Sequence, residues 1–110
     1  MSNDEKKSFN KLFAHYYRTE TPFIQMELTE AINIIRDDGV LIRNQKKTNH
    51  QIKRLKKSFV WQYTCHQYRI WYHFEGEQIK YDLIFKKKQN KLDRNLLEAV
   101  EKRIKNNKLQ

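Results

Sequence analysis

Basic side chains that can act on a phosphate gather around two adjoining stretches in the second half of the chain. Arg69 lies in the first stretch, and Lys86, Lys87 and Lys88 end the second. Cleavage of RNA without a metal needs a base for the ribose 2′-hydroxyl, a cation for the phosphorane and a proton donor for the leaving oxygen. Arginine suits the second role because it is always charged and can hold a phosphate with two hydrogen bonds. We expect these residues to be catalytic, or else only to hold a nucleic-acid backbone.

The two stretches predict a β-hairpin. Apolar and polar side chains alternate from Tyr68 to Phe74 and again from Ile79 to Phe85, as they do in half-buried strands. The residues between them include Gly76, which can take the positive φ that a tight turn needs. The pattern predicts one aromatic face and one basic face, and the basic face carries Arg69, His73, Lys80 and Lys86.

The positions of the lysines and of His73 lead to two further expectations. Lys86 and Lys88 are two residues apart, so their side chains point to the same face of a strand, and ordinary antiparallel pairing would bring both to the face of Arg69. His73 changes charge near neutral pH and could shuttle a proton, although its place near the turn favours an exposed side chain that contacts RNA.

Helices are expected on either side of the hairpin in sequence. Phe9 to Tyr17 fits a helix better than a strand, although an edge strand near its end is also defensible. Thr21 before Pro22 predicts a helix start, and Gly39 predicts its end. A final helix over 92–108 has an apolar stripe that predicts packing on the aromatic face. The stripe consists of Leu92, Leu96, Val100 and Ile104.

A run of positive charge from Arg43 to Lys57 leads directly into the strand that begins near Val60. Such a run is usually a solvated loop, but here it delivers cations beside the hairpin. We expect four of them to grip RNA with a steep dependence on salt: Lys53, Arg54, Lys56 and Lys57.

Length and composition indicate one domain over residues 1–110, with residues 1–8 as a frayed tail, and the expected helices and strands make it an α+β domain. The net charge is +10 and the pI is about 9.8, which favours nucleic acid as a partner over a membrane surface, with solubility alone as the simpler alternative. Cys65 is the sole cysteine, so an internal disulfide is excluded and a reducing compartment is expected. The polar N-terminus has no apolar core of the kind a secretory signal needs, which predicts a cytoplasmic protein.

Other chemistries have little support in the sequence. His15, His50, His66 and His73 lack the spacing of a metal site, so we expect no metal. Neither glycine belongs to a phosphate-binding loop, and no serine has the context of a nucleophile, so nucleotide cofactors and serine catalysis are not expected either.

The order of several short motifs resembles the RelE/HigB toxin superfamily, especially its phage-derived branch. The matching pieces cover about residues 23–107. They are Gly39, Lys53-Arg54-Leu55, Trp61, Tyr68-Arg69-Ile70, Phe85 to Lys88, and Leu97-Glu98-Ala99 with Lys102 and Arg103.

This resemblance implies a small twisted antiparallel sheet with N-terminal helices and a C-terminal helix. It also implies the toxin of a type II toxin–antitoxin pair that cleaves messenger RNA on the ribosome without metal, and that a cognate antitoxin, often a helix-turn-helix protein, neutralises. Arg69 would match the phosphate-stabilising arginine of the family. Lys86 and Lys87 would match its further cations, and Gln62 would hydrogen-bond the substrate.

The chain departs from the family pattern after Trp61. Gln62-Tyr63-Thr64 stands where the family often has Glu-Leu-Arg, so a strong base and a second arginine are missing. The catalytic groups would then be lysines of shifted pKa, His66 or His73, or ribosomal RNA that the protein positions. The alternative is a non-catalytic module of a phage or mobile element that holds nucleic acid or a protein. A DNA-binding regulator that uses residues 32–57 is weaker, because the spacing of a helix-turn-helix is missing.

Overall fold

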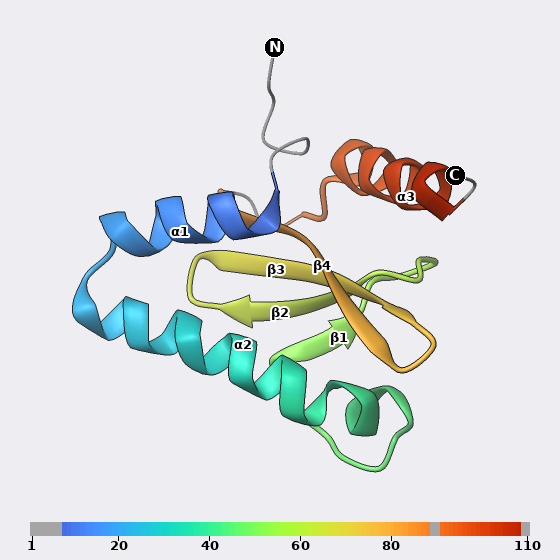
Figure 1. Cartoon of the computed structure of the whole chain (residues 1–110), viewed down its shortest axis with the longest axis horizontal. Coiled ribbons are helices and arrows are strands. Elements are labelled where there is room, and N and C mark those ends of the chain that lie inside the picture. The colour runs from blue at the N-terminus through green and yellow to red at the C-terminus, as the bar shows by residue number, and fades with distance from the viewer. Residues whose placement is uncertain (1–7, 89–90, 109–110) are drawn as a thin grey trace.

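A computed structural model describes residues 8–88 and 91–108 and has three helices and four strands in that part of the chain (Figure 1). Two helices come first, then a β-sheet in the order β1-β2-β3-β4 with every neighbouring pair antiparallel, then a last helix. The α+β prediction is therefore confirmed. The bounds are α1 Phe9–Thr19, α2 Pro22–Arg43, β1 Ile52–Arg54, β2 Trp61–Cys65, β3 Tyr68–Glu75, β4 Gln78–Lys86 and α3 Arg94–Lys108.

Side-chain caps start both N-terminal helices. The Ser8 hydroxyl accepts a hydrogen bond from the Lys11 N–H at 3.3 Å, and α1 is a helix rather than the alternative edge strand. Thr21 does the same for α2 by accepting from the Ile24 N–H at 3.4 Å, with Pro22 in the first turn, where its missing N–H costs nothing. The predicted start of α2 is confirmed. Residues 1–7 of the expected tail lie outside the described residues.

The predicted end of α2 at Gly39 is wrong, because the helix continues through Gly39 to Arg43. The glycine serves close packing instead of a cap. A Cβ atom at this position would lie 2.8 Å from Cδ1 of Ile79 in β4, which is closer than such contacts normally are. The absence of a side chain therefore lets α2 approach the sheet.

The hairpin of β3 and β4 is confirmed, with Gly76 at φ 64° in its turn. The strands pair regularly from Glu75 opposite Gln78 up to Tyr72 opposite Tyr81, but on the other side of Tyr72 the pairing continues with Trp71 opposite Leu83. Asp82 is thus one extra residue in β4, a β-bulge. From Leu83 to Lys86, each side chain of β4 therefore points to the face opposite the one that an unbroken alternation would give it.

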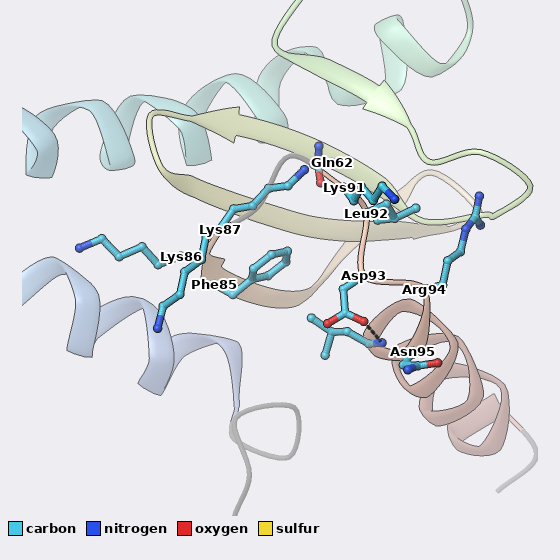
Figure 2. Close-up of a pocket in the computed structure, with 11 residues that line it drawn as sticks. Gln62, Phe85, Lys86, Lys87, Lys91, Leu92, Asp93, Arg94 and Asn95 are labelled. Atoms are coloured by element: carbon cyan, nitrogen blue, oxygen red, sulfur yellow. Dashed lines mark hydrogen bonds between the residues drawn. The ribbon is translucent and has the colours of Figure 1, made fainter.

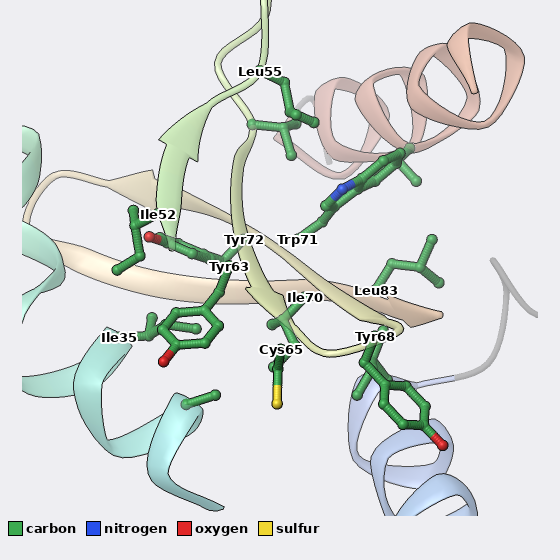
Figure 3. Close-up of a cluster of buried hydrophobic side chains, with 14 of the residues drawn as sticks. Ile35, Ile52, Leu55, Tyr63, Cys65, Tyr68, Ile70, Trp71, Tyr72 and Leu83 are labelled. Carbon is green, nitrogen blue, oxygen red and sulfur yellow. The ribbon is translucent and has the colours of Figure 1, made fainter. Parts of the chain in front are cut away.

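Helices cover both faces of the sheet, and side chains on both faces are buried. Tyr63 and Ile70 lie on the face toward α1 and α2, and Trp71 lies on the face toward α3 (Figure 3). The expectation that α3 packs on the aromatic face of the hairpin is wrong, because α1 and α2 occupy that face. The other face needs a cover because it presents Trp71 and, beyond the bulge, Leu83.

Polar contacts fix α3 at its place. The Ser58 hydroxyl donates to the Glu101 carboxylate at 2.6 Å, and the Arg103 guanidinium donates to the Asp82 carbonyl at 2.9 Å. Among the described side chains of α3, those of Leu97, Val100 and Ile104 are buried in the hydrophobic core. These contacts hold the second half of α3 against the sheet.

Cys65 at the end of β2 is buried, with 3% of its surface exposed. Burial is the main cause that raises the pKa of its thiol to about 11, and Glu27 and Glu30 of α2 add to the rise. A thiol in this state has little thiolate at neutral pH, so a nucleophilic role does not suit it.

Candidate nucleic-acid interface

Three cations meet on the α3 side of the sheet: Lys53, Arg69 and Lys87. Lys53 pairs with Gln62 across β1 and β2, and Arg69 pairs with Phe85 across β3 and β4. The ladder extends by one residue beyond β4, since the Lys87 N–H donates to the Gln67 carbonyl at 2.7 Å. Phe85 and Lys87 are two residues apart and share a face, so the pairing of Phe85 with Arg69 brings Lys87 to the side of Arg69.

Lys86 lies on the opposite face from Arg69, and the expectation that these two share a face is wrong. Lys86 pairs with Tyr68, and its ammonium nitrogen lies 5.7 Å from the centre of the Tyr68 ring and 3.7 Å from the Glu20 carboxylate. The cause is the bulge at Asp82. Figure 2 shows the side chains of Lys86 and Lys87 leaving the end of β4 in opposite directions.

Arg69 is anchored by the turn that precedes its strand. Its Nη1 donates to the His66 carbonyl at 2.8 Å and to the Tyr68 carbonyl at 2.9 Å. His66 has φ 56°, the left-handed conformation of the tight turn between β2 and β3. The side chain of Arg69 is half-buried, and this burial lowers the pKa of the guanidinium, which nevertheless remains charged at neutral pH.

The surroundings of Lys87 disfavour its positive charge. Its partial burial, the charge of Arg69 and the charge of Lys53 all lower the pKa of its ammonium group. Each of the three effects acts against the protonated form. Lys87 is therefore the lysine best suited to proton transfer.

Gln62 is buried, with 4% of its surface exposed, and lies in the same sheet row as Lys53. Its side-chain oxygen accepts a hydrogen bond from the Trp71 indole N–H at 2.9 Å. What this amide can offer a ligand is its –NH₂ group, which only donates.

A cleft of about 530 Å³ opens between the end of β4 and the start of α3 (Figure 2). Asp93 caps α3 by accepting from the Leu96 N–H at 3.0 Å, the dashed line in Figure 2. The other lining side chains are predominantly cationic or apolar. The described residues of the lining are Gln62, Phe85, Lys86, Lys87, Lys88, Lys91, Leu92, Asp93, Arg94, Asn95 and Leu96.

The cations predicted to grip RNA lie before β2. Lys53 and Arg54 belong to β1, a short strand within the basic run, and Lys56 and Lys57 follow it. All four are exposed. The Arg54 guanidinium donates to the Ser58 carbonyl at 3.4 Å, and the Lys56 carbonyl accepts from Arg94 at 3.2 Å. The backbone of Lys56 is thereby connected to Arg94, which lies at the start of α3 and lines the cleft.

His73 is buried, and the expectation of an exposed side chain there is wrong. Its Nδ1 lies 2.8 Å from the Asp82 carboxylate, its Nε2 lies 3.0 Å from the Glu75 carboxylate, and the side chain is 5% exposed. Burial lowers the pKa of the imidazole, but the hydrogen bonds to Asp82 and Glu75 outweigh it and raise the pKa above its ordinary value. This position does not suit a contact with RNA.

Sequence reasoning missed Lys91 and Arg94 as members of the cleft. Both follow Lys88 within a few residues, and the break in the strand pattern after Lys88 was the available signal for a chain reversal beside the strand end. Lys88 itself is exposed at the cleft. Gln89 and Asn90 lie outside the described residues.

Two negative findings apply to residues 8–88 and 91–108. No group of three or more His, Cys, Asp or Glu side chains in these ranges is arranged to hold a metal ion. None of the three helices described there has the length and apolar character needed to cross a membrane.

Comparison of the chain with protein-family models, with curated proteins and with solved structures finds no match. The resemblance to the RelE/HigB toxins therefore rests on the motifs of this sequence and stays a prediction.

Proposed function

We propose that this chain is the toxin of a type II toxin–antitoxin pair and cleaves messenger RNA on the ribosome without a metal. The observation that supports the proposal most is the meeting of Arg69, Lys87 and Lys53 on one face, beside an open cationic cleft. Such a group provides a fixed charge for a phosphate and a lysine with a lowered pKa. Metal-free transfer at a ribose 2′-hydroxyl needs stabilisation of the charge at phosphorus and transfer of a proton, and these two groups would supply them.

In the proposed reaction each cation has a distinct role. Arg69, which two backbone carbonyls hold in place, neutralises the phosphorane. Neutral Lys87 takes the proton of the 2′-hydroxyl as that oxygen bonds to phosphorus, and the resulting ammonium returns the proton to the 5′ oxygen as the bond from phosphorus to that oxygen breaks. Its lowered pKa suits this role because it lies closer to neutral pH than that of an ordinary lysine. Lys53 adds positive charge, and the Gln62 amide donates a hydrogen bond to the substrate.

The remaining partners follow from the same proposal. Arg54, Lys56 and Lys57 are exposed in the segment whose Lys56 carbonyl contacts Arg94 of the cleft, and they would bind ribosomal RNA through its phosphates. A cognate antitoxin, a helix-turn-helix protein in the branch that the sequence resembles, would neutralise the toxin in the cytoplasm.

One observation favours the alternative of a non-catalytic nucleic-acid-binding module. Among the described residues that line the cleft, Asp93 is the one carboxylate and it caps a helix, while no histidine is present. His73 is held by two carboxylates at a buried position. A module that only holds RNA would need the cations and no base.

The test uses two neighbouring lysines that point to opposite faces. Wild type, Arg69→Ala, Lys87→Ala and Lys86→Ala are induced in bacteria, and ends of abundant messages are mapped by primer extension. We expect growth arrest and new message ends with wild type and Lys86→Ala, and neither with the other two variants. Circular dichroism of each purified protein establishes folding.

Two results would count against the nuclease. Normal growth with intact messages at confirmed soluble expression of the wild type would remove it and leave the binding module. Equal activity of Lys86→Ala and Lys87→Ala would remove the assignment of Lys87.

A further inference from the structure

The cleft at the start of α3 combines an apolar lining with hydrogen-bond donors. Phe85, Leu92 and Leu96 are half-buried and line it. Its volume of about 530 Å³ falls within the range of small-molecule sites, ~300–1,000 Å³. A flat aromatic ring that needs hydrogen bonds at its edge fits such a lining.

The Trp71 indole fixes the orientation of the Gln62 amide. An indole N–H can only donate, so the atom of Gln62 that lies 2.9 Å from it must be the oxygen. Trp71 has no exposed surface, and Gln62 is 4% exposed, so packing holds both side chains. The Gln62 –NH₂ group is then a donor with a defined position at the cleft.

The basic side chains of the lining are donors as well. Lys87, Lys91 and Arg94 have no acceptor atoms in their side chains. Asp93, whose Oδ1 already accepts a hydrogen bond from the first turn of α3, and Asn95 are described lining side chains that can accept. Donors thus outnumber acceptors in the described lining, which favours a ligand edge that presents acceptors over one that presents an amino group.

We propose that this cleft binds one unstacked base of single-stranded RNA, and that Gln62, positioned by Trp71, makes it prefer guanine to adenine. This inference rests on the proposed function. Guanine presents O6 and N7 as neighbouring acceptors, whereas adenine places its N6 amino donor beside N7. A donor of the protein that faces the N6 amino group leaves two donors without an acceptor. Splayed bases on aromatic side chains are a usual form of single-stranded RNA recognition, and the surrounding cations attract the backbone.

The experiment measures binding of the purified full chain to seven-nucleotide RNAs in which the central nucleotide carries the only base. Guanine, hypoxanthine and adenine are compared by fluorescence anisotropy at low salt. Hypoxanthine has the O6 and N7 of guanine without its N2 amino group, so it isolates the atoms in question. We expect guanine and hypoxanthine to bind about tenfold more tightly than adenine.

Variants separate the role of Gln62 from general affinity. The quantity to follow is the ratio of the affinity for the guanine RNA to the affinity for the adenine RNA. Gln62→Glu, whose carboxylate cannot donate, should bring this ratio to about one or reverse it, and Gln62→Met should bring it to about one. Trp71→Phe frees the amide to rotate and should narrow the ratio. The control Lys80→Ala removes an exposed cation near the hairpin turn and should keep the ratio of the wild type.

Each outcome decides the inference. A wild-type ratio within twofold of one overturns it, as does a preserved ratio in folded Gln62→Glu or Gln62→Met. Message cleavage without a preference among the three RNAs would remove this inference alone. Neither cleavage nor binding of any RNA would remove the proposed function as well.

Discussion

Arg69 stands opposite Phe85 because Asp82 is an extra residue in β4. If Asp82 were paired with Trp71 instead of bulging, the ladder would continue from Tyr72 and Tyr81 in an unbroken register and bring Ile84 opposite Arg69. The bulge therefore decides which lysine at the end of β4 shares the face of Arg69. It selects Lys87 and sends Lys86 to the other side.

Replacement of Lys87 by arginine should separate charge from proton transfer. The guanidinium introduced by Lys87→Arg would keep the positive charge but cannot lose its proton at neutral pH. We expect this variant to bind RNA within about twofold of the wild type while its cleavage rate falls by ~10²–10⁴, the usual contribution of a general acid or base. Single-turnover cleavage on programmed ribosomes measures the rate, and filter binding measures the affinity. Full cleavage by this variant would show that Lys87 acts by charge alone.

The salt dependence of RNA binding should report the exposed cations beside β1. Removal of Arg54, Lys56 and Lys57 together should reduce the slope of log K against log salt by about 0.7 for each phosphate contact that is lost. The measurement is a binding titration of single-stranded RNA between low and physiological salt. Lys102→Ala, which alters an exposed residue of α3, should leave the slope unchanged. An unchanged slope in the triple variant would exclude this segment from the interface.

The stability of the fold should decrease as pH rises above neutrality, because of His73. Its pKa is raised in the folded state, so its protonated form stabilises the fold fully below the unfolded pKa of about 6.5. That contribution is lost as pH rises through the folded pKa. It amounts to about 1.4 kcal/mol for each unit by which folding raises the pKa. The charged groups around it are Asp82, Glu75 and Arg103.

Urea unfolding at pH 6 and pH 9 measures the effect of His73. The change in the free energy of unfolding between these pH values should be larger for the wild type than for His73→Gln, which does not titrate. An equal change in both proteins would contradict the assignment to His73.

Gly39 and Ile79 should be energetically coupled. Alanine at position 39 gains roughly 1 kcal/mol of helix propensity but brings its Cβ to 2.8 Å from Cδ1 of Ile79. Ile79→Val deletes that methyl group. We expect Gly39→Ala to stabilise the Ile79→Val background by about 1 kcal/mol and to gain clearly less in the wild type. Thermal and urea unfolding of the four proteins give the coupling, and strict additivity would contradict it.

The sequence predicted those structural features that depend only on residues close together in the chain. The start of α2 at Thr21 and Pro22 and the turn at Gly76 both follow from the backbone preferences of single residues. Gly39 failed as a helix end because its role is set by Ile79, which is 40 positions later.

The candidate site was predicted only in part for a similar reason. Arg69 and Lys87 were selected by residue type, but no pattern of alternation reveals a bulge at Asp82. His73 reads as exposed because its partner carboxylates are polar as well, and polar residues that satisfy one another can be buried together. Lys91 and Arg94 join the cleft through the position of α3, which depends on the whole core.

The buried thiol of Cys65 gives this protein a built-in reporter of its own opening. As the sole cysteine, with a pKa of about 11 and 3% exposure, it should be almost inert toward thiol reagents in the folded chain. Reaction then requires opening of the contact between β2 and α2, so the labelling rate measures how often this contact opens. The same rate, taken for each variant above, reveals whether a lost function comes from a lost side chain or from a loosened fold.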